Sequence, residues 1–298
     1  MVDVTLFIKQ LINGFQVGSV YALVALGYTM VYGIVKLINF AHGDFIMVGG
    51  YMAVFSIPLL TSAGLPAWLC ILLSVVVCAL IGFLTEKIAY KPLRGAPSLS
   101  VLITAIAMSL FLENLALILF SSAPRSVSNI FHVPPIVFGS VQLTGVSVVT
   151  ILLSVAIMAG LQLFIKKTRM GKAMRAVSED GKAAILMGIN TNRTISLTFA
   201  IGSGLAGVAA VMYCSAYPQV QPYMGSMLGL KAFVAAVLGG IGNIPGAMLG
   251  GVLIGLVESM TKGYISTQLA DAVVFGILIV VLLVRPAGIF GKNIGEKV

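Results

Sequence analysis

The sequence LKAFVAAVLGGIGNIPGAMLGGVLIGLVES, at residues 230–259, is an apolar run that is broken at its centre. It exceeds the roughly 20 residues of one membrane span and falls short of two comfortable spans. Its middle, GGIGNIPG at 239–246, holds four glycines and a proline, which disfavour a continuous helix. The segment therefore predicts two short helices joined by irregular backbone, as either a re-entrant hairpin or two crossings.

Irregular backbone at membrane depth is tolerated only where protein buries it or where it lines a watered cavity. We therefore expect Gly240, Asn243 and Pro245 to border a passage through the membrane. Glycines around the break recur at four-residue spacing, which lets helices approach closely in lipid. For the glycines, tight helix packing is favoured over direct contact with a transported molecule.

A second break lies nearer the start of the sequence, where INFAHGD at 38–44 places Asn39, His42 and Asp44 in an apolar region. A charge inside a span costs roughly 2.5–3.5 kcal/mol on insertion scales. An acid in the first turn of a helix complements the positive end of the helix dipole. We interpret Asp44 mainly as a cap of the restarted helix and His42 as polar lining, with substrate contact as the alternative. Two interrupted segments in corresponding halves also suggest an internal repeat of the kind that transporters use.

Composition assigns the chain to the polytopic membrane proteins. Apolar residues make up 59% and charged residues 9% of the 298 residues, whereas a soluble domain has about 25% charged residues. No long polar run separates a soluble unit, so residues 1–298 are predicted to form one all-α membrane domain with about eight transmembrane helices. The expected apolar spans are 10–33, 45–60, 66–85, 99–120, 141–165, 195–216, 228–241, 246–261 and 270–284.

The distribution of positive charge orients these spans. Most Lys and Arg residues lie at Lys36, in 87–94, in 166–193 and from Arg285 onward, which is the pattern of cytoplasmic loops. The loop at 121–135 carries one Arg and is predicted to be external, and counting back places the start of the first span outside as well. Orientation and contact with anionic lipid account for the net charge of +9 without a nucleic-acid partner.

Motifs for enzymatic chemistry are missing at the polar positions of the sequence. An intramembrane aspartyl protease would need Gly-x-Gly-Asp, whereas residues 41–44 read AHGD, and a rhomboid-type Gly-x-Ser-Gly is not met by IGSG at 201–204. The sequence has no Gly-x-x-x-x-Gly-Lys-Ser/Thr loop for nucleotide, and its three cysteines lack metal-ligand spacing. We expect no catalytic residue, no metal and no cofactor in this chain.

Other ionisable residues near the spans have simpler interpretations. Glu86, beside a basic cluster, and Asp271, at the start of a span, are expected to be solvated at the membrane interface. For Glu113 a hydrogen bond across helices is favoured over a role in a pathway. Glu258 lies four residues before Lys262, the spacing of an ion pair on one helix.

The basic segment at 166–193 is predicted to be a cytoplasmic loop with two short helices. The first spans Gly171–Val177, and the second follows a Ser178 cap and stops at Gly188. Glu179 and Asp180 at the start of this second helix disfavour an orientation flat on an anionic leaflet. Docking to a cytosolic partner is therefore favoured. The residues expected to serve this docking are Gly171, Arg175, Glu179, Asp180, Ala183 and Gly188.

Three stretches of the sequence together resemble the permease subunits of bacterial branched-chain amino acid ABC importers. They are GYTMVYGIVKLINFAHGDFIMVGGY (27–51), KKTRMGKAMRAVSEDGKAAILMGINTNRTISLTFAIG (166–202) and KAFVAAVLGGIGNIPGAMLGGVLIGLVE (231–258). The likeness extends over nearly the whole chain. It implies an ABC importer permease fold in the bacterial inner membrane, with both interrupted segments beside the pathway.

The resemblance also implies an assembly. A second, related permease would complete the pathway, two cytosolic ATPase subunits would dock on the 166–193 loop and consume the ATP, and a periplasmic binding protein would deliver leucine, isoleucine or valine. Relatives in the wider family carry amides, urea and other amino acids, so the substrate is the least sharply implied part. The alternative function is an ion- or proton-coupled amino-acid carrier that uses Asp44, Glu113 or Glu258.

Overall fold

The computed structural model describes residues 4–36, 38–138 and 141–291, and in these ranges the regular structure is helical apart from two short antiparallel strand pairs. The long helices are α1 (Val4–Val35), α2 (His42–Ser62), α3 (Cys70–Thr85), α4 (Ser98–Phe120), α5 (Gly145–Lys167), α8 (Thr191–Ala216), α9 (Met224–Gly239), α10 (Ile244–Tyr264) and α11 (Ala270–Val284). The shorter ones are α6 (Arg169–Glu179), α7 (Gly181–Leu186) and the turns η1 (Ala67–Leu69), η2 (Glu86–Tyr90) and η3 (Lys91–Leu93). The antiparallel strand pairs are β1 (Arg125–Ser126) with β4 (Gln219–Val220) and β2 (Ile136–Phe138) with β3 (Val141–Leu143).

Each predicted apolar span corresponds to a helix, which confirms the all-α polytopic class. Within the described ranges, seven helices are long and apolar enough to cross a membrane, and α9 and α11 are shorter apolar helices. The predicted number of about eight membrane helices lies between the seven long helices and the nine obtained when α9 and α11 are included. Two basic residues that the positive-charge argument places inside, Lys292 and Lys297, lie outside the described residues.

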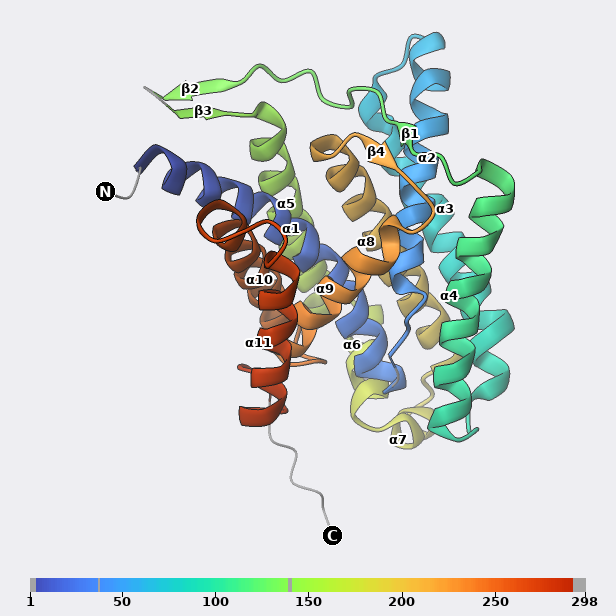
Figure 1. Cartoon of the computed structure of the whole chain (residues 1–298). Helices are drawn as coiled ribbons and strands as arrows, with labels where there is room; N and C mark the ends of the chain where they lie inside the picture. Colours follow the sequence, from blue (N-terminus) through green and yellow to red (C-terminus); the bar gives the residue numbers. More distant parts are fainter. Residues whose placement is uncertain (1–3, 37, 139–140, 292–298) are drawn as a thin grey trace.

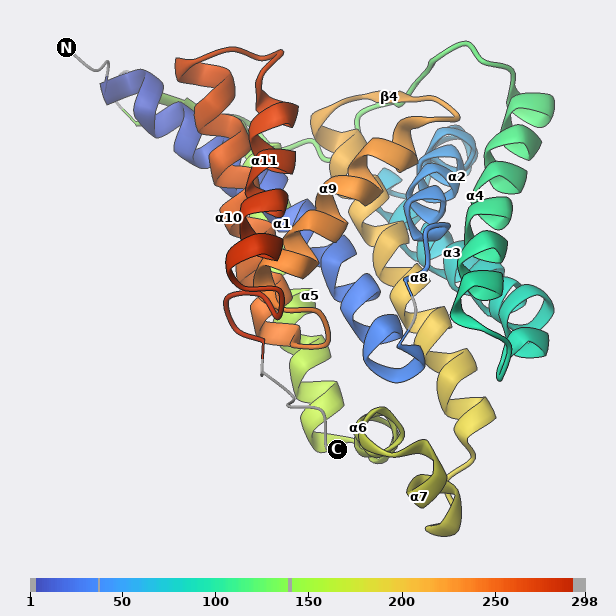
Figure 2. The same ribbon diagram turned by 60° about the horizontal axis from the view of Figure 1, so that its bottom comes forward.

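The two ends of the bundle differ in content. Figure 1 shows α6 and α7 at one end and the strand pairs at the other, and Figure 2 shows α6 and α7 projecting beyond the bundle. Helix α1 begins at the strand end and runs toward α6. The start of the first span and the 121–135 loop therefore lie opposite the 166–193 segment, as predicted, and the assignment of the two ends to the outside and the cytoplasm stays a prediction.

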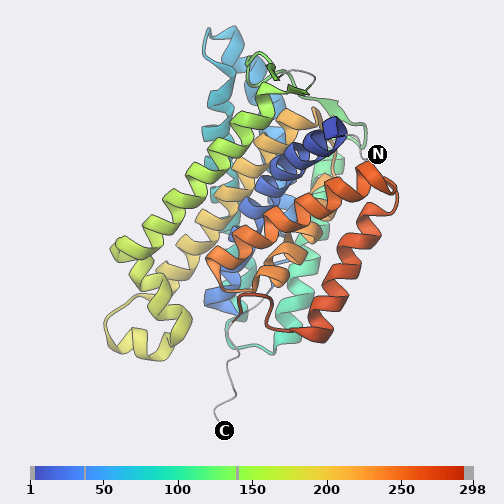
Figure 3. The same cartoon turned by 90° about the vertical axis from the view of Figure 1, so that its left-hand side faces the viewer.

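Helix α1 is the centre of the bundle. All its residues from Gly18 to Val31 are buried, as expected for a helix that is apolar all round. It packs most extensively on α10, beside which it lies in Figure 3. At the periphery, α4 buries only a stripe of its surface and exposes large apolar side chains such as Ile118 to the lipid. Helices α9 and α10, which flank the second break, are thus both held against this buried central helix.

The contact between α1 and α10 depends on the absence of a side chain at Gly255. A Cβ atom at this position would lie 2.3 Å from the Gly18 Cα. We expect Gly255→Ala to lower the free energy of unfolding by about 1–3 kcal/mol, because overpacking forces the two backbones apart. Denaturant unfolding in detergent measures this, with Gly276→Ala as the control because its Cβ meets nothing within 4 Å. Equal stability of the two variants would contradict the packing argument.

Candidate functional site

The break between α1 and α2 is organised by Asn39. Its Oδ1 accepts hydrogen bonds from the Ala41 backbone N–H at 3.1 Å and from the Tyr90 hydroxyl at 2.6 Å. Its carbonyl accepts from the His42 N–H at 3.1 Å. This Asx-type turn reverses the chain after α1 and starts α2 inside the protein. The predicted interruption at 38–44 is present, and Asn39 is the residue that shapes it.

Asp44 lies in the first turn of α2 but does not cap it. The N-cap residue is Ala41, where no side chain accepts a capping hydrogen bond. Both Asp44 carboxylate oxygens are buried without a hydrogen-bond partner among the described residues. Asp44 is therefore not the N-cap residue, but it lies in the first turn of α2, as its predicted interaction with the positive end of the helix dipole requires.

His42, the first residue of α2, is packed in an aromatic site. Its ring lies edge-on to Tyr28 with centroids 4.6 Å apart and to Phe45 with centroids 5.9 Å apart. The side chain is 1% exposed, and its Nε2 has no hydrogen-bond partner in the described part of the chain. In this arrangement His42 is buried in the protein, and the polar lining expected of it stays a prediction.

The break between α9 and α10 is a four-residue connection in which Gly240 is buried and Gly242 is exposed. Gly240 and Gly242 adopt φ angles of +96° and +93°, which other residues rarely adopt. Asn243 caps α10, since its Oδ1 accepts from the Gly246 N–H at 3.2 Å, and its Nδ2 donates to the Phe290 carbonyl at 2.8 Å. Pro245 lies in the first turn of α10, where a missing N–H is tolerated. The predicted irregular backbone is therefore present, and the chain after α11 contacts it at Gly240 and Asn243.

The starts of α2 and α9 meet at a glycine contact. A Cβ atom at Gly43 would lie 2.5 Å from the Gly225 carbonyl oxygen, and one at Gly229 would lie 2.7 Å from the Gly43 Cα. The two interrupted segments therefore touch, although at the first turns of α2 and α9 and not at their two breaks. The second break lies near α6 instead. Gly242 lines a cavity of about 80 Å³ together with Arg175 and Ser178.

The segment at 166–193 forms two helices whose boundary differs from the prediction. Asp180 caps α7, accepting from the backbone N–H groups of Lys182 at 2.8 Å and Ala183 at 3.0 Å. Ser178, predicted to be this cap, lies within α6 and donates to the Arg175 carbonyl. Asp180 has the extended backbone that a capping residue needs, so it displaces Ser178 from the role.

Of the remaining residues expected to serve docking, some pack against the bundle and others lie on the protein surface. Gly171 faces the end of α5, where a Cβ atom would lie 2.3 Å from the Ile165 carbonyl oxygen. Glu179 and Ala183 are exposed. Gly188 has a φ of +79° just beyond α7 and ends the helix there, as predicted.

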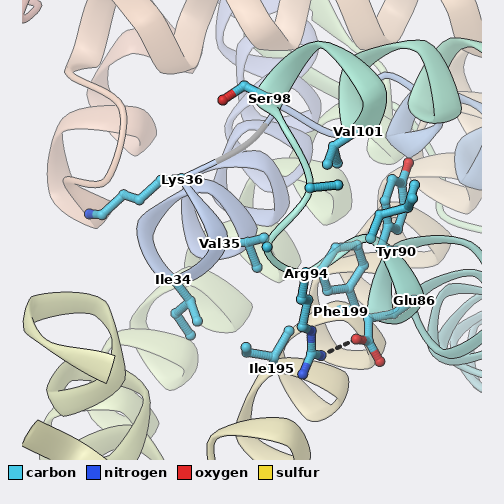
Figure 4. Close-up of a pocket in the computed structure, with 13 residues that line it drawn as sticks. Ile34, Val35, Lys36, Glu86, Tyr90, Arg94, Ser98, Val101, Ile195 and Phe199 are labelled. Carbon is cyan, nitrogen blue, oxygen red and sulfur yellow. Dashed lines mark hydrogen bonds and ion pairs between the residues drawn. The ribbon is translucent and has the colours of Figure 1, made fainter. Parts of the chain in front are cut away.

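A cavity of about 360 Å³ lies between the end of α1, the turns η2 and η3, and the start of α8 (Figure 4). Glu86 lines it and is fully buried, forming an ion pair with Arg94 and accepting a hydrogen bond from the Ser196 hydroxyl. The prediction that Glu86 is solvated at the interface is wrong. Arg94, which follows η3, and Ser196, near the start of α8, are the two partners that bind the buried Glu86 carboxylate.

Comparison with known proteins shows the family to which this chain belongs. Residues 10–283 match the family model described as branched-chain amino acid transport system / permease component. The chain belongs to this permease family. It is 46% identical to the high-affinity branched-chain amino acid transport system permease protein BraD of Pseudomonas aeruginosa, over 100% of both chains. It is 43% identical to the corresponding protein LivH of Escherichia coli K12, over 98% of each chain.

Membership in the permease family confirms the resemblance drawn from the three sequence stretches and makes this chain a multi-pass membrane protein. The roles expected for individual residues remain predictions. Among the described residues, the chain brings Gly242, next to Gly240 and Asn243, close to Arg175 on α6. It keeps Asn39, His42 and Asp44 at a separate site, at the start of α2.

Sequence reasoning missed Lys231 as a member of a buried ion network. Its Nζ lies 2.8 Å from Glu258 Oε1 and 2.6 Å from Asp271 Oδ1, and Tyr21 donates to Glu258 Oε2 at 2.6 Å. Lys262 pairs with Glu258 at 2.6 Å, which confirms the predicted pair at four-residue spacing. The signal for Lys231 is its position as a cation inside an apolar run, which demands a partner on another helix.

Proposed function

We propose that this chain is a membrane-spanning subunit of a bacterial ABC importer that carries leucine, isoleucine and valine inward across the inner membrane. The observation that carries the proposal is the family match over residues 10–283. Full-length relatives named for high-affinity branched-chain amino acid transport support the substrate class.

Two cytosolic ATPase subunits are the partners proposed for α6 and α7. Helix α7 presents an apolar tip outside the bundle, with Leu186 88% exposed and Met187 82% exposed. Basic residues surround this segment, which favours the cytoplasmic side over the lipid. ATP binding and hydrolysis are assigned to these partners, because this sequence has no P-loop.

Coupling from the ATPases to the spans would pass through α6. This helix buries Met174 and Val177 against the bundle and lies beside the second break at Gly242. A displacement of α6 would therefore reshape the cavity that it shares with the connection between α9 and α10. We infer an alternating-access mechanism in which this connection moves with the ATPases.

A second related permease and a periplasmic binding protein complete the proposed importer. The binding protein would dock at the strand end of the bundle, opposite α6 and α7, and would select the substrate. The chain therefore needs no tight membrane site, and helix ends within the bundle can provide transient polar contacts for the cargo.

Affinity purification of the chain from cells that express the whole importer tests the assembly. We expect the two ATPases and the second permease to copurify, and the chain purified alone to hydrolyse no ATP. Recovery of the inserted chain without any ATPase partner, under conditions in which those ATPases are expressed and soluble, would contradict the proposed function.

A further inference from the structure

Buried acids in the described part of the chain fall into two groups. Glu86 pairs with Arg94, and Glu258 pairs with Lys231 and Lys262. Asp44 and Glu113, which are 1% and 8% exposed, form no ion pair with any described cation. An uncompensated carboxylate is strongly unfavourable away from water, so this second group requires an explanation.

Asp44 and Glu113 lie on two sides of the start of α9. A Cβ atom at Gly225 would lie 3.2 Å from the Asp44 Cα, and the next residue, Ser226, donates its hydroxyl hydrogen bond to Glu113 on α4. The two acids therefore border the same turn of α9, at the consecutive residues Gly225 and Ser226. Ser109 on α4 lies near the Asp44 carboxylate without forming a regular hydrogen bond.

Charge at this junction is compensated only in part by the helices. The starts of α2 and α9 each contribute roughly half a positive charge from the helix dipole. Two ionised carboxylates carry two negative charges, and the two helix ends together offset about one of them. About one negative charge therefore remains at the junction. One bound cation would neutralise the junction, and both oxygens of Asp44 lack a hydrogen-bond partner among the described residues.

The surroundings of the junction suit an amphipathic cation. Ser109 and Ser226 are partly exposed, so the protein surface lies beside the two acids. Beside them in the chain, Leu110 on α4 and Met227 on α9 expose apolar side chains. A ligand with a cationic group near an aliphatic chain matches this pairing of carboxylates and apolar surface.

We propose that Asp44 and Glu113 form a site between α2, α4 and α9 that accepts the ammonium group of an amino-acid cargo during its passage. The proposal rests on the proposed importer function and adds the contact that the membrane subunit makes with the cargo. Asp44 would bind the ammonium directly, while Glu113, held by Ser226, would supply the second negative charge.

The test uses the whole importer in proteoliposomes, with its binding protein, ATP and radiolabelled L-leucine. Asp44→Asn and Glu113→Gln are expected to reduce uptake roughly tenfold or more, the effect of losing a charged hydrogen bond. Binding-protein-stimulated ATP hydrolysis should persist in both variants, and Asp44→Glu should restore part of the uptake. Asn114→Ala is the matched control, because this neighbour of Glu113 is exposed and donates only to the Leu110 carbonyl of its own helix.

A second measurement keeps the proposal testable if either variant fails to assemble. A diazirine analogue of leucine, delivered to the unchanged importer and photolysed during turnover, should label peptides of α2, α4 or α9. Labelling confined to other helices would overturn the site, as would unchanged uptake in both Asp44→Asn and Glu113→Gln.

Uptake by the unchanged importer that requires sodium, or that stops when a protonophore is added, would assign the site to an inorganic cation or a proton and overturn the ammonium assignment. Absence of leucine uptake by the unchanged importer would instead contradict the proposed function itself, and this inference with it.

Discussion

Replacing Leu186 and Met187 by aspartate is expected to abolish binding of the ATPase subunits and, with it, ATP-driven uptake. Both side chains protrude at the tip of α7, which Asp180 holds by capping. Burial of two large apolar side chains contributes about 3–6 kcal/mol, so the Kd for the ATPases should rise at least about a hundredfold. Copurification of the ATPases with the membrane subunits measures the loss.

The change is expected to leave the bundle folded, because most of the Leu186 and Met187 side chains lies outside its packing. Gly181→Ala in the same helix is the matched control, since its Cβ would meet no atom within 4 Å. We expect this control to retain both the ATPases and the uptake. Full ATPase binding by the double aspartate variant would show that α7 is not the docking surface.

Removal of the Glu258 carboxylate is expected to produce the largest loss of stability among single changes in the bundle. Glu258 is 2% exposed and accepts from Tyr21, Lys231 and Lys262. Breaking a buried ion pair from one side costs about 3–5 kcal/mol, because the other charge stays buried. Glu258→Leu should lower the free energy of unfolding in detergent by this amount.

A second change separates the ion pair from the packing. Lys231→Met added to Glu258→Leu should recover part of the lost stability, since the stranded cation is then gone. Asp271→Asn should have a small effect, about 1 kcal/mol or less, because Asp271 is 44% exposed and screened by solvent. A Glu258→Leu variant as stable as the unchanged protein would refute the structural importance of this network.

Local patterns were sufficient to predict the helices and both interruptions. Apolar runs of membrane length gave the spans, and the Gly and Pro residues at 239–246 gave the break between α9 and α10. The same is true of the pair of Glu258 and Lys262, which lie one turn apart on one helix. These features depend on neighbours in the sequence, and a single sequence contains that information.

Contacts between distant helices were not predictable in the same way. Lys231 finds its partners 27 and 40 residues further along. Glu86 is buried only because η3 and the start of α8 fold over it. Asp44 looks like a cap in the sequence, yet Asn39 forms the turn through a bond to Tyr90, 51 residues away. The internal repeat, the pathway and the docking roles stay predictions for the same reason.

Uptake of leucine by proteoliposomes that contain the chain, its partner permease and two ATPases tests the central claim most directly. We predict accumulation that requires the binding protein and ATP inside the compartment that the ATPases face, and that persists when ion and proton gradients are collapsed. Accumulation by this chain alone, without ATP and driven by an imposed ion or proton gradient, would contradict the importer and support a secondary carrier.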